Sequence, residues 1–370
     1  MRIVVFSPAS SHPRYHRRVQ SMLDAGHEVT VYTYTRGYYE VNRYPSGARI
    51  IDLGDVENGK YFRRLPKLLH GMRVIRDVER TLPRPDVAYA FGLDAALIMI
   101  MSVGKDVITG YEVGDLRSAV VNKALSTWPV RALERWILRH VDVLVVTSPG
   151  FVQHHYKHIV ADDSEVIIAE NRIPARIASM VKRPTERTFA PNGRIRIGVV
   201  GLLRYPRTFL PLIDAVKSHP ARFELHVHGD GPLAPQFRDA ARVASNIYYH
   251  GPFRNPDDLG KIYDNLDVSY FVYDNTETNV RLAIPNKLYE SMYFGVPGIV
   301  AASTTLAERV QQLGVGFVVD PSKGDFVGRW LETVSIDDIK GAAERCLMVP
   351  KDELVEDDEN LLRALERRAS

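Results

Sequence analysis

Short apolar runs alternate along the chain with longer segments whose apolar residues recur at helical spacing. Residues 2–6 and 29–34 predict two buried strands, and residues 12–25 between them predict a helix that stops at Gly26. A strand, a helix and a strand within about thirty residues predict two parallel strands joined by a right-handed crossover. The same alternation starts again at residues 195–200. We therefore expect an α/β protein made of two successive halves, each with its own parallel sheet.

A segment rich in proline and basic residues separates the two halves. Residues 175–193 include Pro184, Pro191 and Gly193 and show no clear period, which is typical of a linker. The first domain is therefore expected at residues 1–174 and the second at residues 194–355. Further strands are predicted at residues 86–90, 106–109, 141–146, 165–169, 223–228, 246–251, 267–272, 298–302 and 316–319.

The composition is that of an ordinary globular protein. The 370 residues are enough for two separate cores, and 45% hydrophobic and 25% charged residues are usual values. A formal charge of +3 is too small to indicate nucleic-acid binding by itself. The single cysteine, Cys346, excludes an internal disulfide and fits a reducing compartment.

The chain shows no targeting or spanning segment at the level of its sequence. The first apolar run ends at Ser7, so no signal peptide is expected. The longest apolar run, at residues 95–101, is far shorter than the roughly 20 residues of a spanning helix. We therefore expect a cytoplasmic protein.

One stretch of the second half, IPNKLYESMYFGVP at residues 284–297, predicts a short helix with both ends marked. Pro285 suits the first helical position, and Gly295 can take the left-handed conformation that closes a helix. Lys287 and Glu290 are three residues apart and lie side by side. A cation in the first turn opposes the helix dipole unless an anion such as a phosphate sits at the helix start. Glu290 could then accept hydrogen bonds from two ribose hydroxyls; the alternative is an exposed ion pair that contributes roughly 0.2–0.5 kcal/mol.

The sequence PNKLYESMYFGVP resembles the nucleotide-sugar motif of glycosyltransferase family 4, in the variant form Pro-Asn-Lys-Leu-(aromatic)-Glu followed by Gly-x-Pro. By this resemblance Glu290 matches the glutamate that holds the donor ribose, and Asn286, Lys287 and Leu288 belong to the donor-binding motif. The common form of the family has a second glutamate eight positions earlier, where this chain has Leu282.

The resemblance implies the GT-B fold, in which two Rossmann-like domains face a central cleft and the last helix, here 356–370, packs back on the first domain. It also implies transfer of a hexose, with retention of configuration, from a nucleotide-diphosphate sugar to a hydroxyl of a glycan or lipid-linked glycan. The setting would be bacterial cell-surface polysaccharide synthesis. Family members usually need no metal, so no cofactor is expected besides the donor substrate. Two alternatives stay open, namely a catalytically inactive nucleotide-sugar-binding or scaffold protein of this fold and a nucleotide-sugar epimerase.

The loop after the strand at 195–200 holds candidate diphosphate contacts. Gly201 begins this loop, and Arg204 and Arg207 follow it, where two guanidinium groups suit a diphosphate; surface arginines are the alternative. Family 4 usually has an arginine directly after this glycine and a lysine six residues after it. Leu202 and Arg207 occupy these two places here.

Two further loops of the second half complete the candidate donor site. Gly229 and Gly231 allow close backbone approach to a ligand, although a tight turn would need them too. A polar loop at residues 273–279 precedes the key helix. It holds Glu277 and Asn279, the expected replacements for the missing glutamate.

The first half offers candidate acceptor residues at the start of its first helix. His12 and Arg14 lie close to the loop that borders the ligand crevice of an open α/β sheet, whereas Arg17 and Arg18 are expected on a solvated basic face. The loop at 7–13 has no Gly-x-Gly-x-x-Gly, which argues against a dinucleotide cofactor in the first half.

Acidic residues after the predicted strand at 106–109 are candidates for proton transfer. Glu112 or Asp115 could accept the acceptor hydroxyl proton, and either could equally cap the next helix. Near them, Gly92-Leu93-Asp94 resembles the Asp-Leu-Asp pattern of some family 4 members, so Asp94 is a further candidate acceptor contact.

Residues 61–80 predict an amphipathic helix whose polar positions are mostly basic. Around it lie Lys60, Arg63, Arg64, Lys67, Arg73, Arg76 and Arg80, against Asp77 and Glu79. Such a helix suits an anionic membrane surface, here the inner face of the cell membrane; the alternative is an ordinary surface helix with one face in the core.

Overall fold

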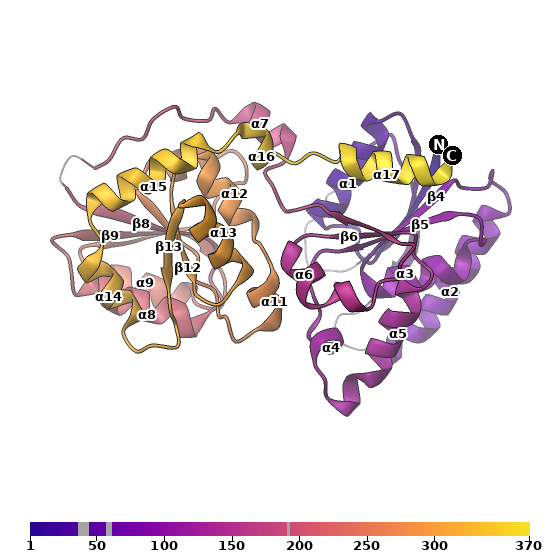
Figure 1. Cartoon of the computed structure of the whole chain (residues 1–370), viewed down its shortest axis with the longest axis horizontal. Coiled ribbons are helices and arrows are strands. Elements are labelled where there is room, and N and C mark those ends of the chain that lie inside the picture. Colours follow the sequence, from indigo (N-terminus) through magenta and orange to yellow (C-terminus); the bar gives the residue numbers. More distant parts are fainter. Residues whose placement is uncertain (36–43, 57–60, 191–192) are drawn as a thin grey trace. The chain divides into compact units, whose positions relative to one another are not determined.

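The structure is a computed structural model that describes residues 1–35, 44–56, 61–190 and 193–370, and of residues 61–65 the backbone alone. The chain forms two compact units (Figure 1). The first consists of Met1–Ala169 with Asp357–Ser370, and the second of Glu170–Glu356. Among the described residues, no helix combines the length and the apolar character that crossing a membrane requires.

The division falls after Ala169, whereas the sequence placed a linker at residues 175–193. That segment belongs to the second unit. It begins with helix α7 (Ala175–Met180), whose Ala178 is buried there. Farther along, Arg183 donates to backbone carbonyl oxygens of the second unit, including that of Val349 at 2.8 Å. These contacts explain why proline and basic residues did not mark a free connection.

The first unit is a parallel sheet with helices on both faces. In the part of this unit that the structure describes, the strand order is β3-β2-β1-β4-β5-β6-β7. The strands are β1 (Arg2–Ser7), β2 (Glu28–Thr35), β3 (Arg49–Asp55), β4 (Val87–Phe91), β5 (Ile108–Val113), β6 (Val143–Val146) and β7 (Glu165–Ile168). The helices are α1 (Pro13–Asp24), α2 (Tyr61–Glu79), α3 (Gly92–Ser102), α4 (Ser118–Val121), α5 (Trp128–Leu138), α6 (Pro149–His154) and α17 (Glu359–Ala369), with short 3-10 turns at Leu125–Thr127 and Tyr156–His158.

The C-terminal helix α17 completes the core of the first unit. Its Leu361 and Leu365 are buried in one cluster with Val19 and Met22 of α1 and with Tyr89 of β4. The other face of the sheet carries α3, which packs on β1, β4 and β5 and contacts α2 and α5. Helices on both faces account for the nearly uninterrupted burial of β1, β4 and β6.

Strand β5 extends four residues beyond the predicted end at residue 109. Gly110 looked like the start of a turn, but it lies within the strand. A Cβ at this position would come 2.6 Å from Cδ2 of Tyr89 on the neighbouring strand, so glycine is required by close packing. Glu112 therefore sits inside the sheet, opposite Phe91 of β4.

The second unit repeats the architecture. Its described residues form a parallel sheet of order β10-β9-β8-β11-β12-β13. The strands are β8 (Ile195–Leu202), β9 (Phe223–Asp230), β10 (Ile247–Gly251), β11 (Val268–Tyr270), β12 (Gly298–Ala301) and β13 (Gly316–Val319). The helices are α8 (Pro206–Lys217), α9 (Ala234–Val243), α10 (Leu259–Asp264), α11 (Thr278–Leu282), α12 (Asn286–Tyr293), α13 (Thr305–Leu313), α14 (Phe326–Thr333), α15 (Ile336–Met348) and α16 (Lys351–Leu354).

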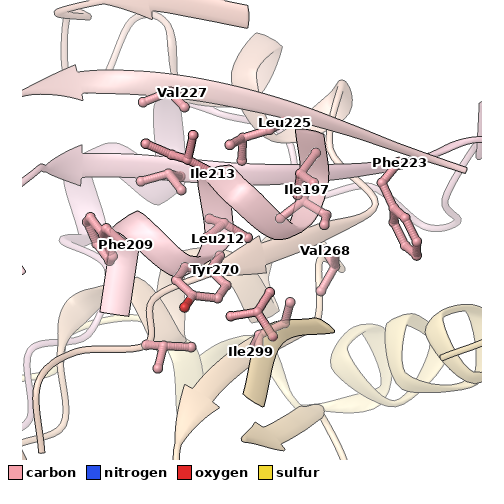
Figure 2. Packing of buried hydrophobic residues seen from close by; sticks show 14 of the residues in the cluster. Ile197, Phe209, Leu212, Ile213, Phe223, Leu225, Val227, Val268, Tyr270 and Ile299 are labelled. Atoms are coloured by element: carbon pink, nitrogen blue, oxygen red, sulfur yellow. The ribbon is translucent and has the colours of Figure 1, made fainter. Parts of the chain in front are cut away.

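Two apolar clusters cover the two faces of this sheet. On one face α8, α9 and α14 bury their apolar sides on the strands. Figure 2 shows this packing, with Phe209, Leu212 and Ile213 from α8 and Ile197, Leu225 and Val227 from β8 and β9. On the other face, α10, α12 and α13 bury their apolar side chains. The carboxyl ends of the parallel strands are left to loops, where ligands of such sheets bind.

Helix α12 is buried along nearly its whole length. It begins at Asn286, directly after Pro285, and Gly295 beyond its end has a φ of +68°, the left-handed conformation expected from the sequence. Leu288 and Met292 are 0% and 2% exposed in the core. The side chain of Leu288, a predicted donor-binding residue, is therefore part of the packing of the second unit.

Candidate functional site

The start of α12 lies against the end of strand β8. Gly201 has a φ of +116°, and a Cβ at this position would lie 3.2 Å from Cε of Lys287. On the neighbouring strand, a Cβ at Gly229 would come 1.8 Å from the carbonyl oxygen of Gly201, and one at Gly231 would come 2.7 Å from that of Leu203. Gly229 thus approaches the backbone of β8 near its end, and Gly231 approaches the first residue of the loop that follows β8. These glycines bring the predicted loops and Lys287 to one place.

Lys287 and Glu290 form a buried ion pair at this place. Nζ of Lys287 lies 2.5 Å from Oε2 of Glu290, and the side chains are 11% and 8% exposed. The alternative of an exposed pair is therefore wrong. Glu290 also accepts hydrogen bonds from Nδ2 of Asn286 at 2.7 Å and from the hydroxyl of Tyr263 at 3.2 Å. A carboxylate has about four acceptor positions, so most are occupied in this state.

Arg207 lies in the first turn of α8 and is held by an aspartate. Its Nη1 donates to Oδ1 of Asp274 at 2.8 Å and its Nη2 to the carbonyl oxygen of Pro321 at 3.4 Å. Partial burial favours neutral Asp274, but hydrogen bonds from Thr276 and Arg207 outweigh it and lower the pKa of that carboxyl group. Sequence reasoning did not single out Asp274, although it belongs to the polar loop expected to supply ligand contacts.

Arg204 is the other exposed arginine at the end of β8. Its guanidinium carbon lies 4.8 Å from the ring centroid of Tyr205, and its Nη2 donates to the hydroxyl of that residue at 2.6 Å. Leu202, in the place where family 4 usually has arginine, is 57% exposed. An exposed cationic and an exposed apolar side chain are therefore both found at the end of β8.

The predicted replacements for the missing glutamate lie at the start of α11. Glu277 is exposed and immediately precedes this helix, while Asn279 and Leu282 lie in it and are half-buried. The sequence placed Glu277 and Asn279 in a polar loop, but in the structure Glu277 is the N-cap of the short helix α11 and Asn279 lies within it. Within the residues that the structure describes, no cluster of three or more His, Cys, Asp or Glu side chains is arranged to hold a metal ion.

Glu112 of the first unit is the centre of a buried charge network. The carboxylate is 1% exposed and accepts hydrogen bonds from Nε of Arg14, from Nε of Arg18 at 3.0 Å and from the hydroxyl of Tyr89. Burial alone would raise the pKa of Glu112, but the two guanidinium groups outweigh it and lower the pKa to about 2. The predicted role of Glu112 as a base is therefore wrong, because an enclosed, strongly acidic carboxyl group cannot take up a substrate proton.

The same network corrects two other expectations. Arg14 was predicted to contact an acceptor, but it is 6% exposed and also donates to the carbonyl oxygen of Ala169 at 3.0 Å. Arg18 was expected on a solvated face, but it is 2% exposed and pairs with both Glu112 and Asp358. Asp358 directly precedes α17, so Arg18 ties the last helix to the first.

Three candidates of the first unit stay near its surface loops. His12 caps α1 by accepting a hydrogen bond from the backbone N–H of Arg14 at 3.3 Å, and burial and nearby arginines lower its pKa. Asp115 is exposed just beyond β5 and acts electrostatically on His12. Asp94 forms an ion pair with Arg117 at 3.1 Å.

Comparison with protein families gives a match in each unit. The glycosyl transferase 4-like domain matches residues 12–171, and glycosyl transferases group 1 matches residues 194–334. The chain belongs to the family 4 (group 1) glycosyltransferases. The resemblance carried by the PNKLYE motif is thereby confirmed, and the protein is a transferase enzyme. It is also 23% identical over 359 residues to the succinoglycan biosynthesis protein ExoL of Rhizobium meliloti (strain 1021), across 93% of this chain and 87% of that protein.

Comparison with solved structures identifies the fold as GT-B. Sucrose-phosphate synthase (tll1590) from Thermosynechococcus elongatus matches with a TM-score of 0.71 at 12% identity, covering 99% of this chain and 97% of that one. Anabaena Alr3699/HepE in complex with UDP matches with a TM-score of 0.70 at 13% identity, covering 100% and 98%. The lipopolysaccharide outer core galactosyltransferase WaaB matches with a TM-score of 0.61 at 14% identity, covering 99% and 95%. The expected fold of two Rossmann-like domains is confirmed.

Proposed function

We propose that this glycosyltransferase moves a hexose, with retention of configuration, from a nucleoside-diphosphate sugar to a hydroxyl of a glycan or lipid-linked glycan. The observation that carries the proposal is the buried Lys287–Glu290 pair beside Gly201 at the carboxyl end of β8. Two similar proteins support the substrate classes: HepE was solved in complex with UDP, and ExoL is a succinoglycan biosynthesis protein. Cell-surface polysaccharide synthesis is the corresponding setting.

A nucleoside diphosphate would give both charges of the buried pair new partners. A ribose that donates two hydrogen bonds to Glu290 has to displace Asn286 or Lys287, because most acceptor positions of the carboxylate are occupied. If Lys287 turns to the diphosphate, the ribose hydroxyls take its place on Glu290. Binding of the nucleoside by Glu290 and binding of the diphosphate by Lys287 are then coupled, because the two residues lie within one turn of α12.

The same cations would stabilise the leaving diphosphate. Negative charge grows on the diphosphate as the bond to the sugar breaks, and preorganised donors stabilise that charge most in the transition state. Lys287 is one such donor. Arg207 becomes another when a phosphate oxygen replaces Asp274, and Arg204 is exposed in the same loop. The free N–H groups at the start of α12 add to this site.

Asp115 is the proposed acceptor-side base, now that Glu112 is enclosed. It is exposed just beyond β5, as an acceptor hydroxyl requires, and it lies near enough to His12 to influence its pKa. His12 and Asp94 are proposed as further acceptor contacts. On the donor side, Glu277 and Asn279 are proposed to contact the sugar ring.

The proposal is tested by screening nucleoside-diphosphate sugars. Thermal unfolding with each compound is expected to single out one nucleotide by the largest rise in Tm, because a ligand that binds only the folded state stabilises it. Transfer or hydrolysis of that donor should follow, and NMR of the fresh product should show the anomeric configuration of the donor. Inversion of that configuration contradicts the retaining mechanism.

Glu290→Gln is expected to weaken UDP binding by roughly tenfold and to leave pyrophosphate binding unchanged or stronger. Glutamine accepts through one oxygen and cannot hold both ribose hydroxyls, whereas Lys287, freed from its carboxylate, remains available to phosphate. A loss of about 1.4 kcal/mol corresponds to this factor. Calorimetric titration with both ligands measures it. Equal losses for UDP and pyrophosphate would show that Glu290 only supports the helix.

A lipid-linked acceptor also implies peripheral contact with the anionic inner face of the cell membrane. The sequence assigned this contact to α2, where Arg63 and Arg64 have side chains outside the described residues. Lys67 donates to the carbonyl oxygen of Asp55 at 2.5 Å and Arg76 to that of Met101 at 2.9 Å. Ile75 of the same helix is fully buried. These contacts fit the alternative of an ordinary surface helix.

A further inference from the structure

Helix α5 and the turn before it expose large apolar side chains. Leu125 is 92% exposed, Trp128 63% and Trp136 39%. These three residues lie within twelve residues of one another. Helix α5 lies on the side of the first unit's sheet that is opposite α17 (Figure 1). Tryptophan usually buries most of its surface, so two exposed tryptophans on one helix indicate a partner.

The exposed tryptophans share one helical face. Trp128, Ala132 and Trp136 follow each other at intervals of four, and Arg135 and Arg139 flank them. The opposite face packs inward: Ile137 and Leu138 are fully buried. One face of α5 therefore packs in the core of the unit, and the face with the tryptophans is exposed to solvent.

Basic residues surround the exposed tryptophans without acidic ones. Lys123, Arg135 and Arg139 are exposed, and in the described part of the chain none of the three forms an ion pair. The single acidic residue of 122–140 is Glu134. It is 2% exposed and faces inward, where it accepts hydrogen bonds from His155 at 2.9 Å and Tyr156 at 3.1 Å. The charged residues of this outer face are thus all basic, and within the residues that the structure describes none is tied to a carbonyl oxygen as Lys67 and Arg76 of α2 are.

We propose that this outer face docks on a bilayer with anionic headgroups. The face consists of Lys123, Leu125, Trp128, Arg135, Trp136 and Arg139. Tryptophan prefers the boundary between headgroups and acyl chains, and arginine and lysine can keep their charges at phosphate level while their stems lie along apolar surface. A helix that carries tryptophans and basic residues on the same side is suited to the boundary between headgroups and acyl chains. The biological role of this membrane contact rests on the proposed lipid-linked acceptor. The arrangement of the exposed residues does not depend on that proposal.

Other exposed apolar residues lack this combination and provide controls. Val243 and Met348, both in the second unit, are 71% and 77% exposed. Neither has a second exposed tryptophan or leucine beside it in the sequence. Arg242 is an exposed arginine paired with Asp239 at 3.0 Å. Changes at these three positions alter exposed apolar surface and charge without touching α5.

Sedimentation with vesicles tests the proposal on the full-length chain. The wild type is expected to bind vesicles that contain phosphatidylglycerol, to bind neutral phosphatidylcholine vesicles weakly, and to lose binding at high salt. Arg135→Glu with Arg139→Glu should lower the partition coefficient by about 25-fold or more, since each basic residue contributes about fivefold near an anionic surface. Trp128→Ala with Trp136→Ala should lower it comparably, while Val243→Ala, Met348→Ala and Arg242→Glu should bind like the wild type.

Quenching of tryptophan fluorescence gives a second, independent measure. The chain has three tryptophans, and Trp330 is 9% exposed in the core of the second unit. Lipids brominated on their acyl chains should quench the wild type. In Trp128→Phe with Trp136→Phe, the remaining Trp330 signal should be unaffected. This variant keeps an aromatic face, so it is expected still to bind vesicles.

Several outcomes overturn the proposal. These are absence of wild-type binding to anionic vesicles, equal binding to neutral vesicles, full binding by the double arginine variant, and a tryptophan-dependent dimer in place of lipid binding. Transfer to a soluble acceptor keeps this test separate from the proposed function. Vesicle binding without transfer contradicts the proposed chemistry alone, whereas transfer without vesicle binding contradicts the membrane surface alone.

Discussion

Lys287→Ala is expected to lower the rate of sugar transfer by about 10²–10³-fold, the loss seen when one preorganised donor to a growing negative charge is removed. Lys287 is held in place before a ligand arrives, because it is nearly enclosed by Glu290 and the backbone at Gly201. No reorganisation is then needed when charge moves onto the diphosphate. The turnover number at saturating donor measures the effect. Binding of UDP and of pyrophosphate should both weaken, in contrast to Glu290→Gln.

A matched control separates this effect from the loss of a lysine ion pair. Lys340 of α15 also pairs with a carboxylate three residues away, Asp337 at 3.4 Å, but the two side chains are 47% and 85% exposed. Lys340→Ala should therefore leave transfer unchanged. Glu290 keeps Asn286 and Tyr263 as donors when Lys287 is removed, so the variant should remain folded. Wild-type turnover in Lys287→Ala would remove Lys287 from the catalytic machinery.

The periodicity of the sequence predicted most strands of both sheets, because strands such as β1, β4 and β6 are buried on both faces and the helices present one apolar stripe. It missed β3, which stands at the end of its strand order and is mostly exposed. It also located α12, since a proline at its start and a left-handed glycine beyond its end are local signals. The placement of Lys287 beside Gly201 was less accessible. It depends on Gly201 of β8, and in the sheet β11 separates β8 from β12, the strand that follows α12. The missing side chain of Gly201 leaves room for the stem of Lys287.

The errors arose where a local signal had a distant cause. Gly110 resembled a turn residue, but the ring of Tyr89 requires it inside β5, and the shift moved Glu112 from a loop into the sheet. Arg18 resembled a surface residue, because its partner Asp358 lies near the other end of the chain. Burial of a charge can be recognised only when its partners are known, and such partners are seldom neighbours in sequence.

Glu112→Gln is expected to destabilise the first unit by about 3–5 kcal/mol at neutral pH, because it leaves Arg14 and Arg18 buried without their shared carboxylate. The lowered pKa of Glu112, about 2, also means that the charged carboxylate stabilises the folded protein. An unfolded glutamate has a pKa of about 4.3, so folding at neutral pH favours the charged form. The stabilisation is fully present above the unfolded pKa and is lost as the pH falls through that value toward about 2. Urea unfolding of both proteins at a series of pH values measures the difference.

Asp115→Asn provides the comparison that separates structure from chemistry. Asp115 is three residues from Glu112 but exposed, so its replacement should change the free energy of unfolding by no more than about 0.5 kcal/mol while lowering transfer. Glu112→Gln should instead lower the free energy of unfolding strongly and affect transfer less. Its difference in unfolding free energy from the wild type should become smaller below about pH 4. If Glu112→Gln instead unfolds like the wild type at neutral pH and transfers no sugar, the buried network is not what holds Glu112 in place. A proton-transfer role for Glu112 would then have to be restored.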